Sequence, residues 1–157
     1  MLEFEKWAPT VSWATVRVLL CLTLNQGWVT RQVDFSNAFV QATLKEDVYV
    51  WLPEGFEPTE GDDDPGSYVL KLNKSLYGLC QSPMYWFFHL KENLETLGLK
   101  QSLIDPCLLY GNGMCVLIYV DDCLFFAEDM TKIDTFIDKL KRAGCWNCGY
   151  RRLYLKF

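Results

Sequence analysis

Apolar residues recur along this chain with two different spacings, which predict helices in some segments and strands in others. Residues 11–25 are mostly apolar. Thr10 can cap a helix before them and Gly27 can end it after them, so the segment predicts a buried helix. The pair Ser82-Pro83 opens a second predicted helix, because serine caps helices and proline suits the first helical position.

The second predicted helix and a third one, residues 130–143, each carry an apolar face. Spacings of three and four residues place one set of side chains inward on each helix. In the second helix, which Gly98 ends, the set is Trp86, Phe87, Leu90, Leu94 and Leu97. In the third helix it is Ile133, Phe136, Ile137 and Leu140. Both helices should therefore pack on a core.

Short segments rich in β-branched and aromatic residues predict strands. They are Trp28–Phe35, Val48–Trp51, Tyr68–Leu72, Leu108–Tyr110, Cys115–Val120 and Cys123–Ala127. The last two flank Asp121-Asp122 and predict a β-hairpin. Helices mixed with hairpins indicate the α+β class, here an antiparallel sheet with helices packed on one face.

Composition favours one folded domain inside the cell. Half of the 157 residues are apolar, which suits one core rather than disorder. No run of about 18 apolar residues occurs, so no membrane span is expected. The first residues lack the basic start and apolar core of a signal peptide. Residues 53–67 predict a loop, in which Asp62-Asp63-Asp64 is interpreted as solvated charge.

Seven cysteines are present, most of them in apolar segments. In an intracellular chain we interpret them as reduced core residues. Cys145 and Cys148 form one C-x-x-C pair, and His89 is the only histidine. A structural zinc site needs four ligands at suitable spacing, and no second pair of ligands lies near this one in the sequence. We therefore do not expect the C-x-x-C pair to bind zinc.

The formal net charge of −5 opposes nucleic-acid binding, because affinity for a phosphate backbone comes largely from Lys and Arg. A local basic face or basic parts outside this chain would resolve the conflict. We favour the second explanation.

Two acidic features conflict with their surroundings. Asp121-Asp122 lies between two apolar strands, where adjacent carboxylates repel each other and resist burial. Asp34 ends another apolar strand. A divalent ion such as Mg²⁺ would resolve both, because it prefers oxygen ligands, and two such ions could activate an attacking hydroxyl and stabilise a leaving oxygen. The alternative is a solvated turn and a loop residue without chemistry.

Four sequence segments carry a family resemblance. Tyr119-Val120-Asp121-Asp122 resembles the Y-x-D-D signature of reverse transcriptases. The further segments resemble copia-type retrotransposon reverse transcriptases in order and spacing, together covering roughly residues 8–143. They are Gln32–Phe39, Val48–Phe56 and Leu72–Pro83, with Asp105-Pro106-Cys107 also fitting.

The resemblance implies a right-hand polymerase palm in which Asp34, Asp121 and Asp122 bind Mg²⁺ or Mn²⁺ and are catalytic, with the carbonyl of Phe35 as a further metal ligand. Three more residues receive roles in the same way. Phe39 is the aromatic gate beneath the nucleotide sugar, Gly78 lies against the incoming nucleotide, and Tyr119 packs beside the primer end.

The implied activity is RNA-directed DNA polymerisation by two-metal transfer of a nucleotide from a dNTP to a primer 3′-hydroxyl. The partners would be an RNA or DNA template-primer, dNTPs and the rest of a retrotransposon polyprotein, in a cytoplasmic virus-like particle or in the nucleus. We assign residues 1–143 to the palm with partial fingers and no thumb, and residues 144–157 to a tail that does not match the family.

Two alternatives remain open from the residues. The chain could be an inactive remnant of a decayed element, because it lacks the segments that grip the triphosphate and the primer. It could also be a two-metal nuclease or integrase, which uses three carboxylates as well. The Tyr-Val-Asp-Asp and Leu-Tyr-Gly-Leu segments favour the polymerase.

Overall fold

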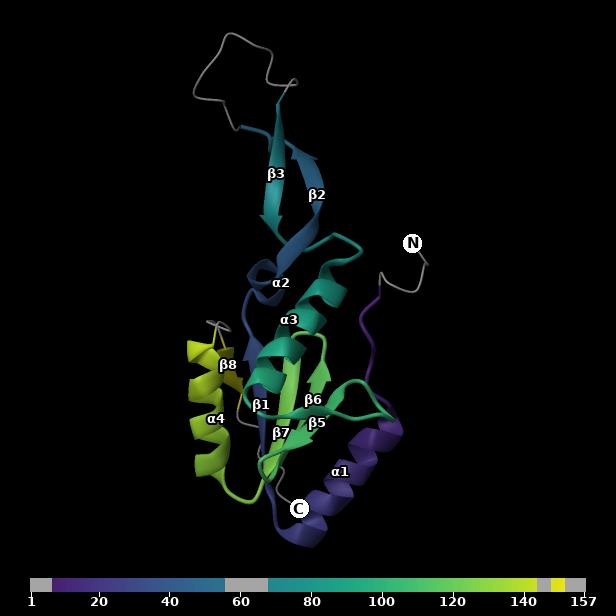
Figure 1. The fold of residues 1–157 in the computed structure, drawn as a ribbon, viewed down its shortest axis with the longest axis vertical. Coiled ribbons are helices and arrows are strands. Elements are labelled where there is room, and N and C mark those ends of the chain that lie inside the picture. Colours follow the sequence, from purple (N-terminus) through teal and green to yellow (C-terminus); the bar gives the residue numbers. More distant parts are fainter. Residues whose placement is uncertain (1–6, 56–67, 144–147, 152–157) are drawn as a thin grey trace.

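The computed structural model describes residues 7–55, 68–143 and 148–151 (Figure 1). Its helices are α1 (Trp13–Gln26), α2 (Ala38–Gln41), α3 (Ser82–Thr96) and α4 (Met130–Arg142). Its strands are β1 (Val29–Phe35), β2 (Thr43–Trp51), β3 (Val69–Lys74), β4 (Lys100–Gln101), β5 (Leu108–Gly111), β6 (Met114–Tyr119), β7 (Asp122–Ala127) and β8 (Cys148–Arg151).

Six of these strands form one antiparallel sheet in the order β4-β5-β6-β7-β1-β8. Strands β2 and β3 form a separate hairpin that projects from one end of the molecule (Figure 1). The mixture of helices and antiparallel strands confirms the predicted α+β class. The short elements α2, β4 and β8 were not predicted, because segments of two to four residues show no periodicity.

The main core lies between the sheet and the helices α3 and α4. Alternate residues of the strands point to this side, among them Val33, Val116, Ile118 and Phe125, all of which are buried. The predicted inward residues of α4 are buried as well, and so are those of α3 except Leu97, which is partly buried against the same core. The apolar spacing of these two helices therefore predicted their packing correctly.

Helix α1 packs on the opposite face of the sheet, so the prediction that all helices share one face is wrong. A second buried cluster joins Leu19 of α1 to Leu117 of β6 and Phe126 of β7. Both strand residues alternate with those that face α3 and α4, which places them on the other side. The sheet is thus covered by helices on both faces.

The prediction that α1 is buried is also wrong. Only Leu19 and Thr23 of this helix are buried, whereas Trp13 is 75% exposed and Val18 and Leu24 are exposed as well. The apolar residues of α1 lie on all sides of the helix, but only one of these sides contacts the sheet. Ser12, not Thr10, caps its start, and Gly27 ends it with a φ of +65° as predicted.

Asp105 ties the start of α1 to the sheet. This buried carboxylate accepts hydrogen bonds from the Ser12 amide at 3.0 Å and from the Thr15 hydroxyl at 2.5 Å. The amide of Cys107, beside β5, donates a third hydrogen bond at 3.0 Å. One side chain therefore fixes where α1 meets the face of the sheet.

Ser82 is the first residue of α3 rather than its cap, which is Gln81. The Ser82 hydroxyl instead donates to the carbonyl of Leu76 at 2.5 Å and accepts from the hydroxyl of Ser75 at 2.5 Å. Ser75 and Ser82 are both buried. These bonds fix the segment between β3 and α3 against the start of the helix.

The cysteines are less uniform than predicted. The five whose side chains the structure describes are free thiols, but Cys21 and Cys80 are exposed, whereas Cys107 and Cys123 are buried and Cys115 is half-buried. Burial raises the pKa of the Cys107 thiol to about 12. The Asp62-Asp63-Asp64 triplet and Cys145 lie outside the described residues. Within the described part of the chain, no helix has the length and apolar character needed to cross a membrane.

Candidate active site

Asp34 and Asp122 are direct partners in the pairing of β1 with β7. Residues directly opposite on antiparallel strands have Cβ atoms about 4.5–5.5 Å apart and point to the same face. That face is the one that carries α1, because Val33 and Cys123, the neighbours of the two aspartates, point into the main core. Both carboxylates are half-buried. The structure therefore brings these two predicted site residues together.

Asp121 lies beside this pair in the turn between β6 and β7. Its carbonyl accepts a 2.9 Å hydrogen bond from the Phe35 amide. The turn residues are Val120 and Asp121, and Asp122 already belongs to β7. The prediction that Asp121-Asp122 forms the turn is thus wrong by one residue. This shift puts Asp122, rather than Asp121, directly opposite Asp34.

The turn has an unusual backbone at Val120, whose φ is +55°. Positive φ at the first central residue alone is the pattern of a type II′ hairpin turn, which favours glycine there. A β-branched residue in this region is strained, and such strain persists only where surrounding contacts impose it. The turn is therefore held in place by its neighbours.

Trp86 of α3 supplies one of these contacts. Its indole N–H donates a 2.8 Å hydrogen bond to the carbonyl of Val120. Its ring is fully buried and packs on the ring of Phe35 with centroids 5.3 Å apart. The helix thus supports both strands that carry the aspartates. The sequence indicated only that Trp86 faces the core.

Gln32 is a second supporting residue that sequence reasoning did not single out. Its side-chain amide donates a 3.0 Å hydrogen bond to one carboxylate oxygen of Asp122. The signal was present in the strand period, because Gln32 lies two residues before Asp34 and so on the same face. Sequence reasoning assigned no role to the polar side chain at this position.

The donors at this site suit a divalent cation of the Mg²⁺ type, because they are carboxylate oxygens. Within the described residues, no three His, Cys, Asp or Glu side chains are arranged to hold a metal ion by themselves. Mg²⁺ often uses only one or two carboxylates and completes its shell with waters and substrate phosphates. Asp34 and Asp122 meet that smaller requirement, with Asp121 adjacent.

The residues expected to contact a nucleotide lie toward the β2–β3 hairpin. The ring of Phe39, in α2, packs on the ring of Tyr77 with centroids 4.5 Å apart. Gly78 follows with a φ of +96°, and a Cβ at this glycine would meet no atom within 4 Å. Glycine is therefore needed there for its backbone conformation rather than to relieve a contact.

Tyr119 ends β6 opposite Asp122, and its side chain is 58% exposed. A cavity of about 440 Å³ lies beside it, between α1 and the sheet. The lining residues are Val11, Trp13, Val16, Gln32, Leu117, Tyr119, Asp122, Cys123 and Leu124. Asp122 thus opens onto a recess with mainly apolar walls.

The fold and the site together give one arrangement, in which an antiparallel sheet carries paired aspartates at a strained Tyr-Val-Asp-Asp turn. The model of the reverse transcriptase (RNA-dependent DNA polymerase) family matches residues 2–145. The chain belongs to this family.

The curated relatives are retrotransposon polyproteins. The Retrovirus-related Pol polyprotein from transposon RE1 of Arabidopsis thaliana is 37% identical over 142 residues, 88% of this chain and 9% of the relative. That from transposon TNT 1-94 of Nicotiana tabacum is 32% identical, over 80% of this chain and 10% of the relative. The Transposon Ty1-GR1 Gag-Pol polyprotein of Saccharomyces cerevisiae is 30% identical, over 84% and 7%. The chain thus spans about a tenth of these relatives or less.

Proposed function

We propose that this chain is the catalytic palm of an RNA-directed DNA polymerase from a copia-type retrotransposon polyprotein. The observation that carries the proposal is the register of β1 and β7, which pairs Asp34 with Asp122 and leaves Asp121 at the adjoining turn. The family implies a requirement for a divalent metal, and the oxygen donors at this position suit Mg²⁺ or Mn²⁺.

In this proposal the chain's own residues hold the reacting groups in place. Asp34, Asp122 and Asp121, with the carbonyl of Phe35, would hold the ions, which supply charge stabilisation at the attacking and leaving oxygens. Tyr119 would contact the primer end, so that its 3′-hydroxyl attacks the α-phosphorus of a dNTP and pyrophosphate leaves. Accurate positioning of this kind accounts for much of the rate in phosphoryl transfer.

Phe39 would act as a steric gate in the same site. Its ring packs against Tyr77, which restricts where the ring can move. A bulky side chain beneath the sugar excludes a 2′-hydroxyl by overlap, so discrimination comes from a clash rather than from a missing hydrogen bond. Gly78, next to Tyr77, would let the backbone lie against the incoming nucleotide.

Primer extension on an RNA template tests the proposal. The parent palm, Asp34→Asn and Asp122→Asn are each placed in a chain that also carries fingers and thumb, and are compared with a DNA primer, four dNTPs and Mg²⁺ or Mn²⁺. Asp47→Asn is the matched control, because Asp47 is exposed on β2 and forms a surface ion pair with Lys71, which contributes little. Extension should occur with the parent and the control and fall to background in the other two variants.

Two results would contradict the proposal. Extension by Asp34→Asn at the parent rate would place the chemistry elsewhere. A parent chain that extends no primer would support the inactive remnant, and one that shortens the primer instead would support a nuclease.

A further inference from the structure

We infer that Gln32 is a positioning residue that orients the Asp122 carboxylate for metal binding. The inference rests on the proposed function and adds a residue to its site. Its basis is the 3.0 Å hydrogen bond from the Gln32 side-chain amide to Oδ1 of Asp122.

The strand register explains how Gln32 reaches Asp122. Gln32 is paired with Leu124, and Asp34 is paired with Asp122, so Gln32 is the diagonal neighbour of Asp122 across β1 and β7. Diagonal neighbours on one face lie within reach of long side chains. Glutamine has the length to span this diagonal from a backbone position that the sheet fixes.

The chemistry of the bond suits orientation rather than metal ligation. The Nε2 amide group only donates, so the nitrogen that contacts Asp122 offers no lone pair to a cation. An ionised carboxylate has about four acceptor sites on its two oxygens, and one bond leaves the others available. The amide therefore restrains the carboxylate without occupying its metal-binding capacity.

The surroundings favour a defined orientation. Gln32 and Asp122 both line the recess beneath α1, together with the apolar side chains of Val16, Leu117 and Leu124. Hydrogen bonds are electrostatically stronger where apolar groups reduce the local dielectric. Partners of this kind typically change metal affinity by 10–100-fold when they are removed.

Mn²⁺ titration followed by electron paramagnetic resonance of the free ion tests the inference without relying on turnover. Gln32→Met keeps the length of the side chain and removes the donor. Gln32→Asn keeps the amide but is one methylene too short, and serves if the methionine variant does not fold. Either variant should bind Mn²⁺ about tenfold more weakly than the parent.

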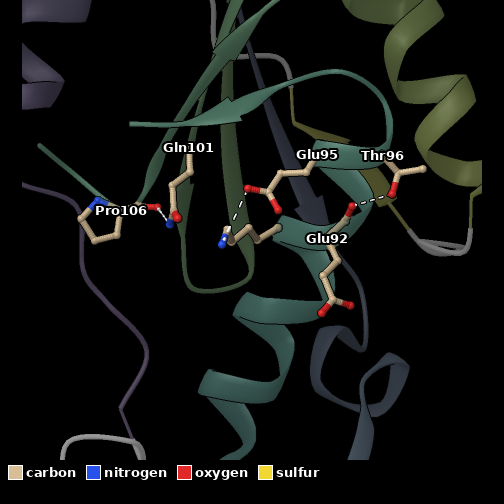
Figure 2. A network of polar contacts seen from close by, with 6 residues as sticks. Glu92, Glu95, Thr96, Gln101 and Pro106 are labelled. Carbon is tan, nitrogen blue, oxygen red and sulfur yellow. Dashed lines mark hydrogen bonds and ion pairs between the residues drawn. The ribbon is translucent and has the colours of Figure 1, made fainter. Parts of the chain in front are cut away.

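Gln101→Met is the matched control. Gln101 is also a half-buried glutamine on a strand of the same sheet, and its Nε2 donates a 2.7 Å hydrogen bond to the carbonyl of Pro106 (Figure 2). Gln101 lies on β4, an edge strand that is separated from β1 by β5, β6 and β7. The control should lose one glutamine hydrogen bond and keep the Mn²⁺ affinity of the parent.

The outcomes separate the inference from the proposed function. A tenfold loss in the Gln32 variants alone supports the inference. Parent-like affinity in a folded Gln32 variant, with binding abolished in Asp122→Asn, overturns the role of Gln32 and leaves the proposed site intact. Parent-like affinity in Asp122→Asn, or no Mn²⁺ binding by the parent, overturns both. Equal losses in the Gln32 and Gln101 variants would show a general effect of destabilisation and also overturn the inference.

Discussion

The indole N–H of Trp86 and the carbonyl of Val120 are joined by a 2.8 Å hydrogen bond. This contact links a fully buried side chain of α3 to the turn that precedes Asp122. Because the φ of Val120 is +55°, the turn is strained and needs such support. The position of the proposed catalytic aspartates thus depends on a helix on the opposite face of the sheet.

Replacing Trp86 with phenylalanine should loosen the turn selectively. Loss of the donor leaves the Val120 carbonyl without this partner, which costs about 1–3 kcal/mol. The loosened turn should appear as faster hydrogen exchange at the Phe35 amide, which donates a hydrogen bond to the Asp121 carbonyl. Phe136→Leu is the control, because it alters a buried aromatic side chain on α4. Equal acceleration of Phe35 exchange in both variants, relative to global stability, would contradict the role of Trp86.

Val120→Gly should leave stability unchanged or raise it by up to about 1.5 kcal/mol. The left-handed backbone costs a residue with a side chain about 1–2 kcal/mol, and the added freedom of unfolded glycine offsets about 0.5–1 kcal/mol of that relief. Val116→Gly, at a fully buried position of β6, should lose at least about 2 kcal/mol. Urea unfolding measures both. A loss above about 1 kcal/mol in Val120→Gly would argue against strain at the turn.

Asp105 should make the fold sensitive to acid. Burial acts to raise the pKa of this carboxyl, but the hydrogen bonds from Thr15, Ser12 and Cys107 outweigh it, and the pKa lies below its ordinary value of 3.8. A lowered pKa in the folded state gives stability that is present above the unfolded pKa and lost as pH falls through the folded one.

Asp105→Asn should therefore be about 1–3 kcal/mol less stable than the parent at pH 7, with the difference shrinking below about pH 4. Urea unfolding between pH 7 and pH 3 measures this. Asp138→Asn, at an exposed position on α4, controls for removal of a carboxylate. A difference between parent and Asp105→Asn that stays constant down to pH 3 would show that the charge of Asp105 is not what ties α1 to the sheet.

In a chain that also carries fingers and thumb, Phe39→Val should raise incorporation of ribonucleotides while leaving use of deoxynucleotides comparatively intact. The smaller side chain would remove the overlap with a 2′-hydroxyl. Tyr77→Phe keeps the ring that packs on Phe39 and should preserve the selectivity of the parent. The measurement is the ratio of kcat/KM for a dNTP and the matching rNTP in primer extension. An unchanged ratio in Phe39→Val would make Phe39 a packing residue only.

Sequence reasoning predicted α3 and α4 well because each has one apolar face. Ile133 and Leu140 are buried as their spacing indicated. The burial of α1 was predicted wrongly because its apolar residues lie on all sides of the helix. The spacing of these residues then does not indicate which side is covered. Its site on the far face of the sheet depends on contacts between Leu19 and Phe126, which are distant in sequence.

Sequence reasoning proposed the residues of the candidate site but not the strand register that brings Asp34 opposite Asp122. The acidic pair among apolar strands and the family resemblance indicated Asp34, Asp121 and Asp122. The observed turn begins at Val120, one residue before the predicted turn. Sequence reasoning missed this because valine rarely adopts a positive φ, so local propensity argued against Val120 in the turn. The hydrogen bond of Gln32 to Asp122 depends on the pairing of β1 with β7, which strand patterns alone do not specify.

The central claim is that Asp34 and Asp122 bind the divalent ion of a polymerase site. The most direct measurement is an anomalous difference map from crystals of the chain grown with Mn²⁺ and a dNTP. The account predicts a Mn²⁺ peak within about 2.0–2.4 Å of a carboxylate oxygen of Asp34 and of Asp122, the range for oxygen ligands of hard cations. Mn²⁺ peaks only at other carboxylates, with these two aspartates uncoordinated, would contradict it.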